Sequence, residues 1–223
     1  MTTAIILAAG KSSRMGTNVD KSFLSLIDKP VLAWSLIAFE RCADIDRIVL
    51  VVRKDKLLAS KEVVKRYGIS KIQSIVQGGA KRQESVQAGL KACDVDTRTV
   101  IIHDAARPCV TSELIGMVAA AVKQTPAVTV GRPMVDTVKH CAKGIVVTET
   151  VDRGKLWTVQ TPQAFQLKTL RDAYAALKSG VEVTDDCQAV ELAGGSVKIV
   201  ECARPNFKIT TAEDLQLVSS LLR

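Results

Sequence analysis

Three short segments combine small residues with charged side chains, a composition typical of phosphate-binding sites. The first segment, residues 7–16, reads Leu-Ala-Ala-Gly-Lys-Ser-Ser-Arg-Met-Gly and directly follows an apolar run. Small residues let the backbone approach a ligand, and its N–H groups can then bind phosphate oxygens. Arg14 and Lys21 could bring two cations to one triphosphate. The segment matches neither the GxGxxG nor the Walker A pattern, and an ordinary glycine-rich turn is the alternative interpretation.

The second segment, residues 78–85, reads Gly-Gly-Ala-Lys-Arg-Gln-Glu-Ser and lies between an expected strand and an expected helix. Two glycines and two cations at the start of a helix predict a site for an anion or a nucleobase. A plain strand-to-helix turn would have the same composition, so this segment alone does not decide between the two.

The third segment, residues 103–108, reads His-Asp-Ala-Ala-Arg-Pro and follows the apolar run 100–102. Ligands of open α/β sheets bind at this carboxyl edge of the strands. A carboxylate there can hold Mg²⁺ against phosphates, so Asp104 is the predicted metal ligand. Arg107 is predicted to bind a second phosphate. His103 is expected to form structural hydrogen bonds, and capping of a helix is the alternative role for Asp104.

Further polar residues lie later in the chain, at Thr137, Arg153, Thr161 and Lys208. Each of them alone is compatible with a turn or with the exposed edge of a sheet. No Ser/His/Asp or Cys/His arrangement is evident in the sequence, so covalent catalysis is not expected.

The elements that must position these residues alternate between short apolar runs and longer amphipathic segments. Hydrophobic residues make up 47% of the 223 positions and aromatic residues only 4%, which suits an aliphatic core of buried parallel strands. The β-α-β alternation predicts an α/β fold with a twisted, mostly parallel sheet and helices on both faces, in a single domain over residues 1–223. Strands are expected at residues 3–8, 47–52, 72–77, 99–103, 127–130 and 197–201, and helices at 30–42, 55–67, 82–93, 112–123, 167–178, 185–192 and 211–221.

The pattern changes at residues 135–159, which are rich in Val and Thr and carry Gly144 and Gly154 as turn signals. We interpret this segment as a β-hairpin or arm outside the main sheet. An isolated two-stranded ribbon is marginally stable in water, so the arm predicts a homodimer in which a second copy covers its apolar face.

Charge and cysteine content limit the expected partners. There are 31 Lys and Arg against 23 Asp and Glu, a net charge of +8, and no run of five basic residues. This distribution favours small polyanions, and neither nucleic acid nor a membrane is expected as a partner. The six cysteines are scattered and form no CxxC pair, so we expect reduced thiols in a cytoplasmic protein.

In this order, the segments resemble those of the sugar-nucleotide and molybdopterin nucleotidyltransferases. Within that group they are most similar to the 2-C-methyl-D-erythritol 4-phosphate cytidylyltransferase family of the non-mevalonate isoprenoid pathway. The resemblance implies a Rossmann-like sheet with a protruding β-arm that forms a homodimer. It rests on residues 7–16, 21–23, 78–85, 103–108, 135–138, 156–165, 184–186 and 206–210.

The resemblance also implies roles for individual residues. Arg14 and Lys21 would stabilise the charge that develops on the α-phosphate of CTP, and Asp104 would support Mg²⁺. Arg153, like Thr161, would reach the phosphorylated polyol from the arm of the partner subunit, and Lys208 would act from the same chain. The CTP site would comprise Ala8, Ala9, Gly10, Gly78, Arg82, Ser85 and Ala105, and the polyol site Asp104, Arg107, Thr137 and Lys208.

One position departs from the family pattern. The family commonly has Pro-Lys-Gln before an aromatic residue, whereas this chain has Asp20-Lys21-Ser22-Phe23. The cation is kept, but the carboxylate of Asp20 could compete with phosphate for it.

The implied reaction is transfer of CMP from CTP to 2-C-methyl-D-erythritol 4-phosphate, with release of pyrophosphate. A ribitol 5-phosphate cytidylyltransferase is the nearest alternative, although Asp152-Arg153 followed by Leu156-Trp157 favours methylerythritol phosphate. A molybdenum-cofactor transferase would usually read Ala-Gly-Gly in the first loop. The alternative from a different class is a non-catalytic module that binds a nucleotide or RNA. The charged residues, with Asp104 among them, argue against a non-catalytic nucleotide-binding module. The scarcity of aromatic residues for base stacking argues against an RNA-binding module.

Overall fold

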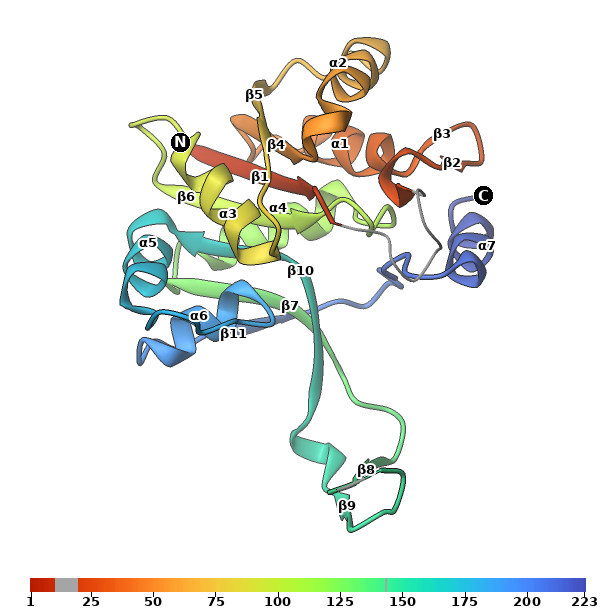
Figure 1. Cartoon of the computed structure of the whole chain (residues 1–223), viewed down its shortest axis with the longest axis vertical. Helices are drawn as coiled ribbons and strands as arrows, with labels where there is room; N and C mark the ends of the chain where they lie inside the picture. The colour runs from red at the N-terminus through yellow and green to blue at the C-terminus, as the bar shows by residue number, and fades with distance from the viewer. Residues whose placement is uncertain (11–19, 143) are drawn as a thin grey trace.

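A seven-stranded sheet forms the centre of the computed structural model, which describes residues 1–10, 20–142 and 144–223 (Figure 1). The strand order is β11-β7-β10-β6-β1-β4-β5, and every neighbouring pair is parallel except those that β10 forms with β6 and β7. The predicted α/β class with a mostly parallel sheet is therefore confirmed. The strands are β1 (Thr2–Ala8), β4 (Arg47–Val52), β5 (Ile72–Gln77), β6 (Thr99–Asp104), β7 (Ala127–Pro133), β10 (Trp157–Gln166) and β11 (Lys198–Glu201).

Helices cover both faces of the sheet because apolar side chains alternate along buried strands. In β1, Ile6 packs in one cluster with Phe39 of α1, whereas Ile5 packs in the opposite cluster with Val86 of α3. Helices α1, α2 and α4 contribute to the first cluster, and α3, α5 and α6 to the second. Their bounds, with that of α7, are α1 (Val31–Arg41), α2 (Leu57–Arg66), α3 (Arg82–Lys91), α4 (Ser112–Ala121), α5 (Leu167–Ala176), α6 (Asp186–Leu192) and α7 (Ala212–Leu221).

The central position of β10 was not predicted. Residues 127–130 were expected to form a short strand, but β7 continues to Pro133 and pairs with the ten-residue β10. Pro162 lies inside β10, where the register with β7 shifts between Gln160 and Gln163. Since proline lacks the N–H that a ladder needs, it argues against a central strand, and a bulge is the usual way to accommodate it.

The predicted arm projects from the sheet, carried by the ends of β7 and β10 (Figure 1). At its tip, β8 (Val138–His140) pairs antiparallel with β9 (Glu149–Val151), and a short 3-10 helix, η4 (Arg153–Lys155), follows. The arm exposes Val135, Ile145, Val146 and Val147.

Several short elements were not predicted either: η2 (Lys21–Phe23), β2 (Ser25–Leu26) and β3 (Lys29–Pro30). A further 3-10 helix, η3 (Lys54–Lys56), lies where the helix of residues 55–67 was expected to begin. Among the residues described, no helix has the length and apolar character that crossing a membrane would require.

Candidate active site

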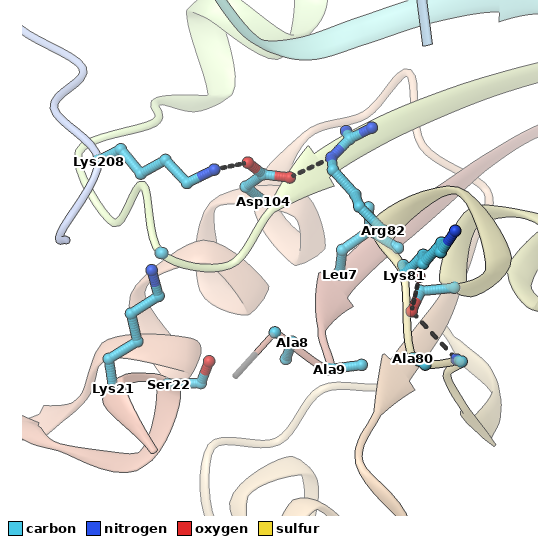
Figure 2. A pocket seen from close by; sticks show the side chains of 14 residues that line it. Leu7, Ala8, Ala9, Lys21, Ser22, Ala80, Lys81, Arg82, Asp104 and Lys208 are labelled. Atoms are coloured by element: carbon cyan, nitrogen blue, oxygen red, sulfur yellow. Dashed lines mark hydrogen bonds and ion pairs between the residues drawn. The ribbon is translucent and has the colours of Figure 1, made fainter. Parts of the chain in front are cut away.

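A pocket opens where β1, β5 and β6 end and where the chain after β11 passes by (Figure 2). Each of the three glycine-containing or charged segments singled out in the sequence contributes to it, because the carboxyl ends of parallel strands share one edge of the sheet. The described lining consists of Leu7, Ala8, Ala9, Gly10, Lys21, Ser22, Gly79, Ala80, Lys81, Arg82, Ser85, Asp104, Ala106 and Lys208.

Asp104, the last residue of β6, lies between two cations in this pocket. Its Oδ2 is 2.5 Å from Nζ of Lys208, and its Oδ1 is 3.3 Å from Nε of Arg82 (Figure 2). Burial acts to raise the pKa of Asp104, but the charges of Arg82 and Lys208 outweigh it and hold that pKa well below its ordinary range. The carboxylate is therefore ionised throughout the physiological pH range.

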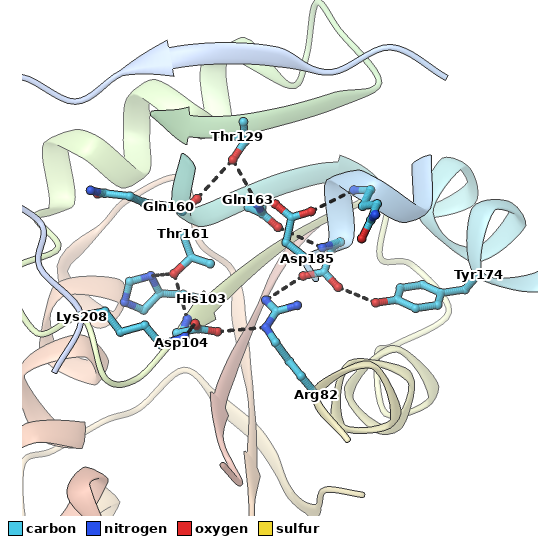
Figure 3. Close-up of polar contacts among 12 residues, drawn as sticks. Arg82, His103, Asp104, Thr129, Gln160, Thr161, Gln163, Tyr174, Asp185 and Lys208 are labelled. Carbon is cyan, nitrogen blue, oxygen red and sulfur yellow. Dashed lines mark hydrogen bonds and ion pairs between the residues drawn. The ribbon is translucent and has the colours of Figure 1, made fainter. Parts of the chain in front are cut away.

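A hydrogen-bond chain beneath the pocket fixes the backbone around Asp104. The backbone N–H of Asp104 donates to Oγ1 of Thr161 at 3.0 Å. Because the carbonyl oxygen of Arg107 can only accept, Nε2 of His103 donates to it at 3.2 Å. Nδ1 of the neutral ring therefore accepts from the hydroxyl of Thr161, 3.2 Å away. Burial lowers the pKa of His103 to about 3, so the ring is neutral and acts as the expected structural hydrogen-bonding residue (Figure 3).

Thr161 lies elsewhere than the sequence led us to expect. It was expected to come with the arm of a partner subunit, but it belongs to the part of β10 within the main sheet and is only 5% exposed. Its hydroxyl contacts Asp104 of the same chain, and its carbonyl oxygen accepts from Nδ2 of Asn206 at 2.8 Å. The reason is that β10 pairs directly with β6, which the sequence analysis did not anticipate.

The first glycine-containing segment enters the pocket through Ala8, Ala9 and Gly10. Arg14 lies outside the described residues. Lys21 lines the pocket and donates to the carbonyl oxygen of Ile209 at 2.9 Å.

Asp20, where the chain departs from the family pattern, is buried beside Lys21. Its carboxylate caps η2 by accepting from the backbone N–H of Ser22 at 3.1 Å, and burial raises the pKa of Asp20.

The second segment does not offer its first backbone amides to a phosphate. Oε2 of Glu84 accepts from the backbone N–H groups of Ala80 at 2.7 Å and Lys81 at 3.1 Å, so these amides at the start of α3 are already occupied. Gly78 allows a close approach to the first segment, since a Cβ on it would lie 2.5 Å from Cβ of Ala9. The loop therefore closes tightly against β1 without offering these two amides to an anion.

The remaining predicted residues lie outside the described lining of the pocket, either next to Asp104 in the chain or on the arm. Ala105 is buried, and Arg107, whose pKa is lowered by burial, donates to the carbonyl oxygen of Asn206 at 2.8 Å. Thr137 and Arg153 are exposed on the arm, outside the described lining of the pocket.

Two residues that sequence reasoning missed lie behind Arg82. The carboxylate of Asp186 forms an ion pair with Arg82 at 2.8 Å and accepts from the hydroxyl of Tyr174 at 2.6 Å. The adjacent pair Asp185-Asp186 was the available signal, but two acidic residues at the start of a helix are usually explained as caps.

The donor set of the pocket fits one particular mode of Mg²⁺ binding. Asp104 is the one acidic residue of the described lining, and the described part of the chain has no cluster of three His, Cys, Asp or Glu side chains that could hold a metal. Mg²⁺ in nucleotide-dependent sites is often held by one or two carboxylates together with phosphate oxygens and water. The pocket is compatible with that mode and not with an all-protein metal cage.

Comparison with known proteins gives one consistent result over the whole chain. Residues 2–223 match the model of the family described as IspD, 2-C-methyl-D-erythritol 4-phosphate cytidylyltransferase. A protein of that name from Syntrophotalea carbinolica is 42% identical over 221 residues, which cover 98% of this chain and 94% of the relative. Another of the same name, from Clostridium botulinum strain 657, is 42% identical and covers 99% of this chain and 96% of its own length.

A solved structure is similar over nearly the whole chain. The crystal structure of 4-diphosphocytidyl-2C-methyl-D-erythritol synthase from Anaerococcus prevotii superposes with a TM-score of 0.88 at 33% sequence identity. The superposition covers 99% of this chain and 95% of that one. The similarity therefore includes the arm as well as the main sheet.

Proposed function

The chain belongs to the 2-C-methyl-D-erythritol 4-phosphate cytidylyltransferase family, and we propose that its pocket transfers CMP from CTP to 2-C-methyl-D-erythritol 4-phosphate. The products are pyrophosphate and the CDP-linked polyol, a precursor in isoprenoid biosynthesis. The observation that carries the proposal is the position of Asp104 between Lys208 and Arg82, beside the backbone of Ala8–Gly10. This arrangement provides positive charge for two phosphorylated substrates at one edge of the sheet.

The chemistry requires neutralisation of charge more than proton transfer. An oxygen of the polyol phosphate attacks the α-phosphorus of CTP, a new P–O bond forms, and the bond to pyrophosphate breaks. The attacking phosphate is already ionised near neutral pH, so it needs no general base. Lys21 and Lys208, together with Arg14, are assigned to stabilise the charge on the reacting phosphates and to align them.

The pocket divides into two half-sites in this proposal. We assign the nucleotide to the first two segments, where the occupied amides of residues 80 and 81 favour a base over a phosphate. We assign the polyol phosphate to the side of Lys208, with Arg107 in the adjacent wall. The nucleotide half-site then comprises Ala8, Ala9, Gly10, Gly78, Arg82, Ser85 and Ala105, and the polyol half-site Asp104, Arg107, Thr137 and Lys208.

Mg²⁺ is the cofactor that we assign to the reaction. When bound, it would neutralise phosphate charge, and Asp104 would be its protein ligand beside oxygens of the triphosphate. Removal of divalent cations with a chelator should abolish turnover, and added Mg²⁺ should restore it. Full activity in excess chelator would refute this assignment.

A homodimer completes the polyol half-site in the proposal. Thr137 and Arg153 lie on an arm whose exposed apolar residues, such as Ile145 at 96% exposure, favour coverage by a second copy. Light scattering at micromolar concentration should give the dimer mass, and a monomer mass would exclude this arrangement. We also propose that the enzyme works in the cytoplasm, which its six unpaired cysteines support.

Isotope labelling tests the proposed reaction directly. With CTP labelled at the α-phosphate, the label should appear in the polyol product, whereas label at the γ-phosphate should appear in pyrophosphate. Release of CMP to water, or label in phosphate alone, would show that the chain is a hydrolase instead.

A further inference from the structure

A fully buried carboxylate, to which no role has yet been assigned, lies behind the pocket. Asp186, the first residue of α6, is 0% exposed and lies outside the described lining of the pocket. Its Oδ2 is 2.8 Å from Nη2 of Arg82 in α3, and its Oδ1 accepts from the hydroxyl of Tyr174 in α5 at 2.6 Å. Figure 3 labels Arg82 and Tyr174. Three helices thus meet at one carboxylate.

Capping of α6 does not account for this carboxylate. Asp185 is the N-cap: its Oδ1 accepts from the backbone N–H of Gln188 at 2.9 Å, and its Oδ2 accepts from Nε2 of Gln163 at 2.8 Å. The side chain of Asp186 points instead to Arg82. Burying an ion pair costs much of the energy that the pair gains, so such a pair is weak evidence for stability and calls for another explanation.

The explanation that the geometry offers is control of the Arg82 guanidinium. This group is planar and donates in fixed directions. Its Nε donates to Asp104 at 3.3 Å, whereas its Nη2 lies 2.8 Å from Asp186 in an ion pair without hydrogen-bond geometry. Two carboxylates thus hold two separate atoms of one plane. Arg82 lines the pocket, so Asp186 can influence a ligand only through Arg82.

Ion pairs connect four charged side chains in this region. Lys208 pairs with Asp104, Asp104 also pairs with Arg82, and Arg82 pairs with Asp186. Without Asp186, the guanidinium of Arg82 would lose the charge that faces its Nη2, whereas the pair between Asp104 and Lys208 would remain. The effect would therefore fall on the nucleotide half-site.

We propose that Asp186, supported by Tyr174, is a positioning residue that holds Arg82 in the orientation needed by the nucleotide. This inference rests on the assignment of Arg82 to the CTP half-site. In this proposal, Asp186 touches neither substrate. Its effect should therefore appear in the Michaelis constant for CTP and should disappear when Arg82 itself is replaced.

The test uses Asp186→Asn in the full-length chain, with Asp185→Asn as the matched control one residue earlier. Asp186→Asn should raise KM for CTP about 10-fold, whereas KM for the polyol phosphate should change less than about 2-fold. Asp185→Asn should leave both constants within about 2-fold, since Asn also caps helices well. Tyr174→Phe should give an intermediate rise in KM for CTP, about 3-fold.

A double-mutant cycle separates positioning from a general structural role. In an Arg82→Gln background, Asp186→Asn should add little to KM for CTP, because the group that it positions is gone. Equal effects of Asp186→Asn in both backgrounds, or a fall in kcat with unchanged KM for CTP, would overturn the inference. If Asp186→Asn does not fold, as judged by circular dichroism, the same cycle with Tyr174→Phe decides.

Nuclear magnetic resonance distinguishes failure of this inference from failure of the proposed function. The Nη protons of Arg82, which face Asp186, should give separate signals in the substrate-free protein because rotation of the guanidinium is hindered, and Asp186→Asn should abolish this separation whereas Asp185→Asn should retain it. An unchanged signal in Asp186→Asn would refute the positioning role even if the wild type transfers CMP. A wild type that does not use CTP would refute the proposed function, whatever the signal shows.

Discussion

The carboxylate of Asp104 lies 2.5 Å from the ammonium nitrogen of Lys208, although 104 residues separate the two in the chain. Asp104 ends β6, and Lys208 lies in the extended segment that follows β11. That segment is held over the tip of β6 by the backbone hydrogen bond from Ile209 to Ala106, 2.8 Å long. The pair therefore ties the C-terminal part of the chain to the edge of the sheet where the phosphates are expected.

Replacement of Lys208 tests the polyol half-site. Lys208→Met should lower kcat/KM for the polyol phosphate by about 100-fold or more, as loss of one preorganised charged donor typically does, and should change KM for CTP little. Lys168→Met is the matched control, because Lys168 is an exposed lysine on α5 that pairs with Asp172. Steady-state kinetics with each substrate varied in turn give the answer, and similar losses in both variants would contradict the assignment.

Replacement of Lys21 or Arg14 tests the charge stabilisation at the α-phosphate. Lys21→Ala and Arg14→Ala should each lower kcat by about two orders of magnitude or more, because these cations act on charge that develops in the transition state. Thermal unfolding should show little loss of stability. Near-normal turnover in either variant would mean that its cation does not act on the triphosphate.

The buried ring of His103 predicts a pH dependence of stability. Its pKa is about 3 in the folded chain and about 6.5 when unperturbed, so the unfolded state binds the proton more tightly. The free energy of unfolding therefore falls as the pH drops from about 6.5 towards 3; at pH 5 the loss from this residue is about 2 kcal/mol. Chemical denaturation at pH 7.5 and pH 5 should show a loss about 2 kcal/mol smaller in His103→Gln than in the wild type. Equal losses in the two proteins would mean that His103 titrates normally.

Arg153 tests the contribution of the arm. Arg153→Ala should raise KM for the polyol phosphate and leave KM for CTP nearly unchanged, since its guanidinium is assigned to the acceptor alone. Lys139→Ala, another exposed cation of the arm, is the control. A loss confined to CTP affinity would show that the two half-sites are assigned the wrong way round.

Mixed dimers test whether Arg153 acts across subunits. Arg153→Ala and Lys208→Met protein, unfolded and refolded together in equal amounts, should regain about a quarter of wild-type activity, because half of the dimers are mixed and each mixed dimer has one intact site. No recovery would indicate that both residues act within one chain.

The sequence predicted best the parts of the fold that local pattern determines. β4 and β5 begin and end as expected, because β4 is a buried apolar run and β5, a partly buried edge strand, ends directly before two glycines. β10 was missed because Pro162 and the polar residues around it suggest a turn, whereas pairing with strands distant in sequence makes this segment a central strand.

The same distinction applies to the site. Asp104 and Arg82 could be predicted because they follow strands at the ligand-binding edge of the sheet. The contact of Arg82 with Asp186 could not, because it depends on how α6 packs against α3. Thr161 was identified as a site residue but expected from the partner subunit, an error that follows directly from missing β10.

A substrate panel tests the central claim most directly. Pyrophosphate release should be measured with CTP, UTP, ATP and GTP, each paired with 2-C-methyl-D-erythritol 4-phosphate or ribitol 5-phosphate in the presence of Mg²⁺. We predict that only CTP with 2-C-methyl-D-erythritol 4-phosphate gives rapid release, and that omission of either substrate abolishes it. Preference for ribitol 5-phosphate, or for any nucleotide other than CTP, would contradict the account.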